Sequence, residues 1–321
     1  MKSSHTVTNE DAGKRLDLFL SQAEADYSRG YFQKLIGEGR VLVGEKPPRK
    51  AGQILKEGEA VIVEHPDPNR RPQGENVALD ILYEDDQVLA INKPAGMVVH
   101  PQDVEEQGTV VHALLNYLPD IAQAVYDPES PMSQLRPGIV HRLDKDTTGV
   151  LLIGKTPEAL EALSSQFKDH SVEKTYLALV SGTAKEESVT TGMQRKPYRR
   201  NMMGVTRTEE EGREAITHFK PVQSFDYFGK PLTLVECRID TGRTHQIRVH
   251  CKFRAHPVLG DDVYTTRTAQ DLTRRLHVDR QLLHAARLTF TNPTTGKRQT
   301  VEAPLPADFM SVVTRLSQKA T

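Results

Sequence analysis

The chain has 321 residues, of which 37% are hydrophobic and 26% charged, with 42 basic against 43 acidic side chains. This composition is typical of a soluble globular protein with one large domain or two ordinary ones. It argues against a membrane protein, because no run approaches about 18 apolar residues, and against a disulfide framework, because only Cys237 and Cys251 are present. The N-terminus lacks the apolar stretch of a signal peptide, so we expect a protein of the cytoplasm.

The first 65 residues predict a small module of two helices and two strands. Apolar side chains recur three and four positions apart, as on the buried face of an amphipathic helix. Ser28 is a suitable N-cap for the second helix, and short apolar runs follow as strands. The expected helices begin near Leu16 and Ser28, and the expected strands cover residues 41–43 and 60–63.

A proline-rich segment separates this module from the rest of the chain. Residues 66–76 contain three prolines, a glycine and no large apolar side chain, which is typical of a linker. The predicted organisation is therefore a first domain over 1–65, a linker over 66–78 and a second domain over 79–321.

The second domain predicts a mixture of helices and strands without regular βαβ spacing. Such a mixture favours an α+β fold with a largely antiparallel sheet. The segment 185–230 has no clear assignment. Expected strands cover 81–83, 88–92, 98–99, 176–180 and 232–239, and expected helices cover 110–118 and the segment after Thr156 and Pro157.

A dense polar segment, His141 to Gly149, lies between two apolar runs. It contains two candidate carboxylates, Asp144 and Asp146. Taken alone, such a segment is as well explained by a charged hairpin tip facing water as by a site mounted on a rigid frame. The net charge of −1 does not decide the matter, because a nucleic-acid surface needs only a local excess of basic residues.

The histidines do not form a metal motif. His245 and His250 are five positions apart on an expected helix, whereas metal-binding pairs usually stand four apart. We therefore expect no metal and assign these histidines to the core or to an RNA-facing surface.

The first module resembles the S4 (αL-type) RNA-binding domain. The segments that carry the resemblance are RLDLFL, SRGYFQKLIGEGRVLV and LKEGEAVIV. The resemblance implies that basic side chains on and beside the helices contact RNA phosphates. Those side chains are Arg15, Arg29, Lys34 and Arg40. The alternative is a small packing domain with ordinary surface charges.

The second domain resembles the RluA family of pseudouridine synthases, in the branch that acts on large-subunit (23S) ribosomal RNA. The matching segments, in chain order, are LYEDDQVLAINKPAGMVVHP, GIVHRLDKDTTGVLLIGKT, VEKTYLALVSG, DTGRTHQIRVHCKFRAHPVLGD and LLHAARLTFTNPTTGKRQTVEAPLP. The resemblance implies an enzyme that isomerises uridine to pseudouridine in RNA without a cofactor.

The resemblance also implies roles for individual residues. Asp144 is the catalytic carboxylate, Arg243 its ion partner, and Tyr176 the aromatic ring that stacks on uracil. Arg142 fills the space left by the flipped nucleotide. Further RNA contacts are implied for His141, His245 and Arg248.

Two other functions remain open at the level of sequence. One is a non-catalytic RNA-binding or ribosome-assembly factor that retains an inactive synthase domain. The other is a glycosidase built on Asp144 and Asp146, which is disfavoured because it would lose the base to water. We expect the protein to act as a monomer on RNA, away from membranes.

Overall fold

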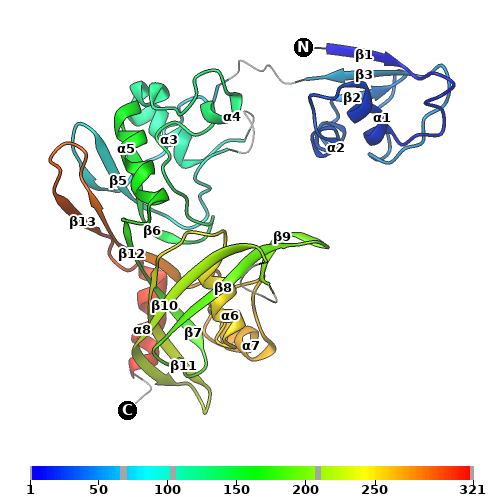
Figure 1. Cartoon of the computed structure of the whole chain (residues 1–321). Helices are drawn as coiled ribbons and strands as arrows, with labels where there is room; N and C mark the ends of the chain where they lie inside the picture. The colour runs from blue at the N-terminus through cyan, green and yellow to red at the C-terminus, as the bar shows by residue number, and fades with distance from the viewer. Residues whose placement is uncertain (1, 66–70, 102–105, 207–210, 319–321) are drawn as a thin grey trace. The chain divides into compact units, whose positions relative to one another are not determined.

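The computed structural model of the protein describes residues 2–65, 71–101, 106–206 and 211–318 (Figure 1). The chain forms two compact units, Met1–Arg71 and Pro72–Thr321. Both units combine helices with a sheet. The predicted α+β class is therefore confirmed.

In the first unit, two helices pack on a small antiparallel sheet of strand order β1-β3-β2. Its elements are β1 (Lys2–Thr6), α1 (Leu16–Ala23), α2 (Arg29–Gly37), β2 (Val41–Val43) and β3 (Ala60–Glu64). Both predicted helices and both predicted strands are present, and Ser28 caps α2 by accepting a hydrogen bond from the backbone N–H of Tyr31. Strand β1 was not predicted, because its residues carry no apolar side chain that could reveal a buried face.

The predicted linker divides into two parts. Residues 66–70 lie outside the described part of the chain. From Pro72 onward the chain belongs to the second unit. There the backbone N–H of Glu75 donates a hydrogen bond of 2.9 Å to the carbonyl of His112 in the first helix of that unit. The second half of the expected linker is thus held on the second unit.

A ten-stranded sheet forms the frame of the second unit. Its strands are β4 (Ile81–Glu84), β5 (Val88–Lys93), β6 (Thr148–Gly154), β7 (Glu173–Ser181), β8 (Glu187–Lys196), β9 (Arg199–Val205), β10 (Arg213–Asp226), β11 (Pro231–Ile239), β12 (Leu283–Thr291) and β13 (Arg298–Glu302). The order is β4-β5-β6-β12-β7-β11-β10-β8-β9, with β13 paired to β12. The pairing of β6 with β12 is parallel and the other strand pairs are antiparallel, as predicted.

Strand β6 is the buried centre of this frame, since every residue of it is buried. Side chains alternate between the two faces of a strand. Accordingly, Leu151 and Ile153 belong to one hydrophobic cluster, and Val150 and Leu152 belong to another. The polar loop that precedes β6 is therefore attached to a rigid element.

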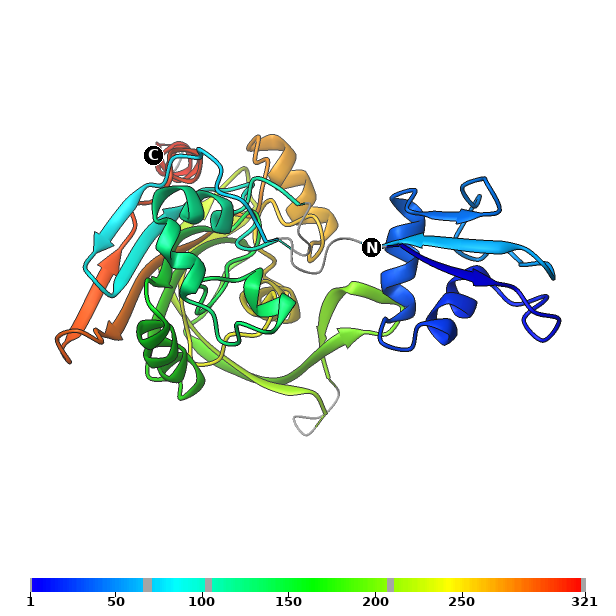
Figure 2. The ribbon, with the colours of Figure 1, turned by 90° about the horizontal axis from the view of Figure 1, so that it is seen from above.

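Helices cover both faces of the sheet (Figures 1 and 2). They are α3 (Val110–Tyr117), the 3-10 helix η1 (Pro119–Gln123), α4 (Pro131–Gln134), α5 (Pro157–Lys168), α6 (Gln246–Phe253), α7 (Arg267–Arg275) and α8 (Ala307–Gln318). Side chains of α3 join the cluster of Leu151, whereas those of α5 join the cluster of Leu152. Around β7 and β11, α6 packs in one cluster, and α7 and α8 pack in another.

Two regions differ from the sequence prediction. Val98 and Val99 do not form a strand; their carbonyls accept hydrogen bonds from the N–H groups of Val110 and Val111, so they complete the start of α3. The unassigned segment 185–230 supplies β8, β9 and β10. Figures 1 and 2 both show β8 and β9 as an arm that projects from the body of the second unit.

Candidate active site

The polar loop before β6 is held through its main chain. The Nζ atom of Lys93 donates to the carbonyl of Lys145 at 2.8 Å, and Nη1 of Arg280 donates to the carbonyl of Asp146 at 3.0 Å. Lys93 is fully buried, and burial lowers its pKa to about 7 against the opposing effect of nearby carboxylates. These contacts set the shape of the loop and leave the side chain of Asp144 to line a cleft.

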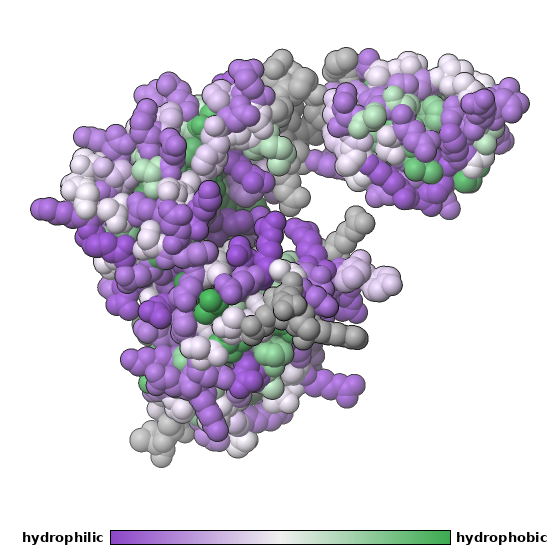
Figure 3. Space-filling view, in the orientation of Figure 1, coloured by the Kyte–Doolittle hydropathy of each residue, from purple (hydrophilic) through white to green (hydrophobic). Residues whose placement is uncertain are grey.

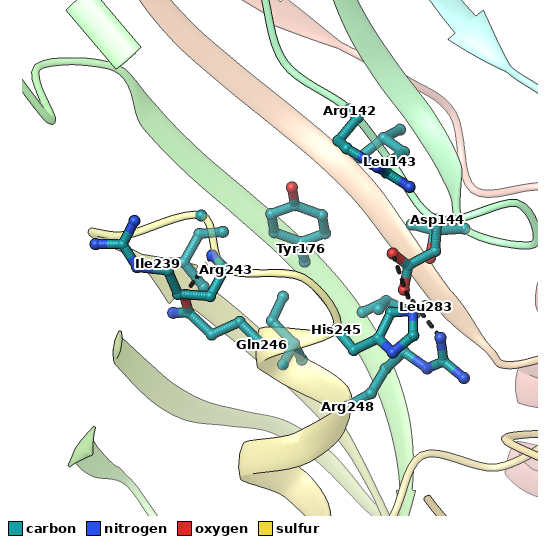
Figure 4. A pocket seen from close by; sticks show the side chains of 13 residues that line it. Arg142, Leu143, Asp144, Tyr176, Ile239, Arg243, His245, Gln246, Arg248 and Leu283 are labelled. Atoms are coloured by element: carbon teal, nitrogen blue, oxygen red, sulfur yellow. Dashed lines mark hydrogen bonds and ion pairs between the residues drawn. The ribbon is translucent and has the colours of Figure 1, made fainter. Parts of the chain in front are cut away.

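Within the described ranges, one carboxylate oxygen of Asp144 accepts a hydrogen bond and the other is open. Arg248 donates from Nη1 to Oδ2 at 3.0 Å (Figure 4). The other oxygen, Oδ1, lies 3.8 Å from Nε2 of His245, which is beyond hydrogen-bonding distance. The side chain is 20% exposed and lines a narrow cleft of about 70 Å³. Oδ1 is therefore available to a ligand that enters the cleft.

A second carboxylate fixes the orientation of Arg248. Its Nε and Nη2 atoms donate to Asp261 at 2.7 and 3.0 Å, and the Asp261 side chain is fully buried. The guanidinium also lies over the ring of Tyr264, 5.2 Å from its centroid. Although burial alone lowers the pKa of Arg248, its bonds to Asp261 and Asp144 raise that pKa above the usual value. Arg248 is thus a permanent cation with one N–H group directed at Asp144.

Tyr264 connects His245 and strand β9 to this assembly. Its hydroxyl shares a hydrogen bond of 2.9 Å with Nδ1 of His245 and accepts one of 2.7 Å from the backbone N–H of Met203. His245 is the N-cap residue of α6 and has a φ of 58°. The prediction that His245 and His250 lie on the same helix is therefore wrong. Burial lowers the pKa of His245, which keeps the ring neutral near pH 7.

Tyr176 forms another wall of the cleft (Figure 4). It lies on β7 opposite Cys237 of β11 and Ala285 of β12. Burial and the negative charge of Asp144 raise its pKa, so the phenol remains protonated at neutral pH. A half-buried ring at this place can pack against a base that approaches Asp144.

Arg243 is not the ion partner of Asp144, contrary to the prediction. Its Nε donates to the backbone carbonyl of Glu214 at 2.8 Å, and Figure 4 shows it on the far side of Tyr176 from Asp144. Arg243 precedes the start of α6, whereas Arg248 is the third residue of the helix and points toward the carboxylate. Arg243 still lines the cleft, so an RNA contact there stays a prediction.

The two residues before Leu143 have different surroundings. Arg142 is exposed at the cleft, and its guanidinium has no partner among the described residues. His141 accepts a hydrogen bond from the N–H of Leu152 at 2.8 Å and stacks on Phe167, and burial lowers its pKa to about 3. The ring of His141 therefore anchors β6 and lies outside the Asp144 cleft.

The four basic residues predicted to bind RNA in the first unit all have acidic partners. Arg15 and Arg29 both donate to Asp17, which is fully buried. The other pair, Lys34 and Arg40, lie 3.6 and 3.4 Å from the carboxylate of Glu38. An RNA contact by these four residues therefore stays a prediction.

Sequence reasoning missed Lys93, Asp261 and Tyr264. Lys93 and Asp261 stand within the quoted segments NKPAG and HPVLGD, but no spacing rule links either one to Asp144. In the described ranges, no group of three or more His, Cys, Asp or Glu side chains is placed to hold a metal, and no helix is long and apolar enough to cross a membrane. Cys237 and Cys251 are both free and buried.

Comparison with known proteins defines the class of this molecule. Residues 87–253 match the family model of RNA pseudouridylate synthases, and residues 14–61 match the S4 domain. The chain belongs to the RNA pseudouridylate synthase family, with an S4 domain in front of the synthase domain. It is thus an RNA-modifying isomerase, as the resemblance in sequence implied.

Similar proteins cover nearly the whole chain. An uncharacterized RNA pseudouridine synthase of Synechocystis is 39% identical over 316 residues, which is 98% of this chain and 92% of the relative. The ribosomal large subunit pseudouridine synthase D of Neisseria meningitidis serogroup B is 36% identical over 329 residues, 98% of this chain and 82% of the relative. Among solved structures, human RNA pseudouridylate synthase domain containing 1 matches with a TM-score of 0.56 and 25% identity, over 77% of this chain and 97% of that one.

Proposed function

We propose that this enzyme converts specific uridines of large-subunit (23S) ribosomal RNA to pseudouridine, with Asp144 as the reacting carboxylate. The observation that carries the proposal is the open Oδ1 of Asp144 in a cleft lined by Tyr176 and Arg248. The choice of RNA is supported by the large-subunit synthase D relative, which this chain matches over nearly its full length.

The chemistry needs an ionised carboxylate beside the ribose. The C1′–N1 bond of uridine breaks, the uracil turns, and C5 bonds to C1′; C5 loses a proton and N1 gains one. Asp144 acts as a nucleophile at C1′ or as a base at C2′, and both roles require an oxygen with a free lone pair. Arg248 supplies the counter-charge through Oδ2 and leaves Oδ1 free. No electron or group donor enters the balance, so we propose that no cofactor takes part.

The base must leave its helical stack to reach Asp144, and flipping costs a few kcal/mol. Arg142 is the exposed side chain at the cleft, so a base gains room when this side chain turns outward. In that position its guanidinium can replace the flipped nucleotide in the RNA stack. Tyr176, with its hydroxyl protonated, then packs on the uracil ring and is placed to exchange the proton at C5.

The S4 unit contributes affinity for the large RNA. Phosphate contacts position a protein on RNA and do not read its sequence, so this unit would supply affinity and register without taking part in the chemistry. We further propose that the protein acts as a monomer in the cytoplasm, where ribosomal RNA is assembled. The two free cysteines, Cys237 and Cys251, are in keeping with a reducing compartment.

Pseudouridine mapping on separate transcripts tests the choice of substrate. The full-length protein is incubated with large-subunit RNA, small-subunit RNA and transfer RNA, with the Asp144→Asn variant as the inactive control. We expect pseudouridine at a few positions of the large-subunit RNA alone. Modification only of the small-subunit or transfer RNA would refute the substrate, and no modification of any RNA would favour a non-catalytic RNA-binding factor.

A further inference from the structure

A second hollow adjoins the Asp144 cleft and shares Arg142 with it. It has a volume of about 470 Å³, which falls in the range of roughly 300–1,000 Å³ usual for small-molecule sites. The residues that matter here are His100, Tyr126, Asp127, Met132, Arg136 and Arg142. Figure 3 shows that hydrophilic side chains cover much of the face of the second unit that is turned to the viewer.

His100 lines this hollow, and one of its ring nitrogens has no hydrogen-bond partner in the described part of the chain. Its side chain is 7% exposed, and its Nδ1 atom is buried without a hydrogen-bond partner. Such an atom costs about 1–3 kcal/mol unless a ligand or water satisfies it. The other buried Nδ1 of this kind among the described residues, in His256, lines a pocket of only about 10 Å³ and has no room for a ligand.

The protonation state of His100 fits a neutral polar ligand. Burial lowers its pKa to about 4, and the charges of Arg136 and Arg142 act in the same direction. The ring is therefore neutral at pH 7, with one nitrogen that donates and one that accepts.

Two guanidiniums at the hollow are uncommitted. Arg136 and Arg142 are both exposed, and in the described part of the chain neither guanidinium has a hydrogen-bond or ion partner. This differs from Arg15 and Arg29, which are both bound to Asp17. A free planar guanidinium such as that of Arg136 fits the oxygens of a phosphate group.

The remaining wall offers a surface for a nucleobase. Tyr126 and Met132 are large side chains that are 55% and 54% exposed. Aromatic rings and the thioether of methionine stack well on bases. Asp127 also lines the hollow and can accept a hydrogen bond from a base amino or imino group, although its Oδ1 already accepts from the N–H of Glu129.

We propose that this hollow binds a second nucleotide of the RNA, adjacent to the uridine that enters the Asp144 cleft. Its base packs against Tyr126 and Met132 and bonds to His100. Its phosphate is bound by Arg136. This proposal rests on the proposed function of the Asp144 cleft, because Arg142 lines both places. The hollow then makes the enzyme sensitive to the nucleotide beside its target.

The test compares three hairpin RNAs: one complete, one lacking the base on the 5′ side of the target uridine, and one lacking the base on the 3′ side. We expect one of the two abasic RNAs to raise the KM of the wild type about tenfold, with kcat unchanged, because one stacked base is lost. Arg136→Ala should raise KM about tenfold on the complete RNA. Met132→Ala should raise KM on the complete RNA and have no further effect on the sensitive abasic RNA, since the two changes remove one interaction.

Arg267→Ala is the matched control, because Arg267 is an exposed arginine that lines neither hollow. Three outcomes would overturn the proposal. They are equal KM values on all three RNAs, additive increases in KM for Met132→Ala and the abasic RNA, and equal effects of Arg136→Ala and Arg267→Ala. The affinity of each variant for the same RNAs is also measured by direct binding, with Asp144→Asn present in every protein. If the wild type forms no pseudouridine in any of these RNAs, the proposed function is refuted. The binding data would still show whether the hollow binds a second nucleotide.

Discussion

Asp17 in the first unit and Asp144 in the second are both carboxylates held by arginine, but they are held differently. Asp17 is fully buried and accepts hydrogen bonds from Arg15, Arg29 and Gln33, which occupy both of its oxygens. Asp144 accepts one bond, on Oδ2, and its side chain remains 20% exposed. The same type of ion pair thus closes one carboxylate and leaves the other open.

The difference follows from where the arginine bonds are directed. In the first unit two arginines converge on one acid, so the acid is saturated. In the second unit one arginine is divided between two acids, and Asp261 takes two of its N–H groups. Arg248 therefore orients Asp144 without covering it. The saturated Asp17 stabilises the fold, whereas the arginine shared with Asp261 leaves one oxygen of Asp144 free to react.

Among the residues that surround the two carboxylates, the largest effect is expected for Arg248→Met. Loss of the counter-charge should lower the single-turnover rate on a hairpin RNA by about 10²- to 10³-fold. It should also destabilise the second unit by about 3–5 kcal/mol, because Asp261 stays buried without its cation. Arg243→Met is the control, and Arg248→Lys keeps the charge if the methionine variant fails to fold. A greater loss of rate for Arg243→Met than for both Arg248 variants would contradict the assignment.

Asp17→Asn should act on stability and leave the chemistry intact. Although burial alone raises the pKa of Asp17, the bonds from Arg15, Gln33 and Arg29 hold that pKa well below its usual range. We expect the free energy of unfolding of the first unit to fall by about 2–3 kcal/mol at pH 7. Hydrogen exchange of the α1 and α2 amides measures the loss, and Asp26→Asn, at an exposed position, is the control.

The wild type and Asp17→Asn should differ in how the stability of the first unit depends on pH. A depressed carboxyl pKa contributes stability above the unfolded value of about 3.9, and the contribution is lost as pH falls through the folded value. The wild-type first unit should therefore lose stability more steeply below about pH 4 than Asp17→Asn does. Parallel curves for the two proteins would show that the Asp17 cluster does not stabilise this unit.

Asp261→Asn should weaken the reaction by a smaller amount. The amide keeps the shape but no longer holds Arg248 by charge, so we expect kcat to fall about 10- to 30-fold, with KM little changed. Asp262→Asn is a matched control, because Asp262 is 88% exposed and 3.9 Å from Nη2 of the same arginine. If the substitution changed only KM, or if both variants had equal effects, Asp261 would not be the residue that positions Arg248.

The smallest effect is expected for Arg142→Ala, which removes an uncommitted cation. Because the side chain acts when the base leaves its stack, the rate should fall several-fold more on a folded hairpin than on an unstructured RNA with the same target. Single-turnover rates on both RNAs measure the difference. Equal losses would make Arg142 a general phosphate contact.

Much of this architecture could be predicted from the sequence. Apolar spacing revealed α1, α2 and α3, and the ordered motifs indicated the synthase domain and Asp144. Strand β1 and the arm of β8 and β9 could not be predicted, because their residues are mostly polar or exposed. In addition, β1 pairs with the distant strand β3.

The partner of Asp144 could not be read from the chain for a different reason. Arg243 and Arg248 lie in one basic segment, and both match the chemistry of a counter-ion. The choice depends on where α6 begins, and that point is set by the left-handed conformation of His245. The role of Asp261 depends on a contact with Arg248, 13 positions earlier in α6, and no periodicity of the sequence predicts such a contact.

The central claim is that the open carboxylate of Asp144 performs the reaction. The most direct test is the single-turnover formation of pseudouridine in one hairpin RNA by the wild type, Asp144→Asn and Asp146→Asn, with RNA affinity measured in parallel. We predict no product above background for Asp144→Asn at unchanged affinity, and a rate close to that of the wild type for Asp146→Asn. Substantial turnover by Asp144→Asn, or loss of the reaction only in Asp146→Asn, would contradict the claim.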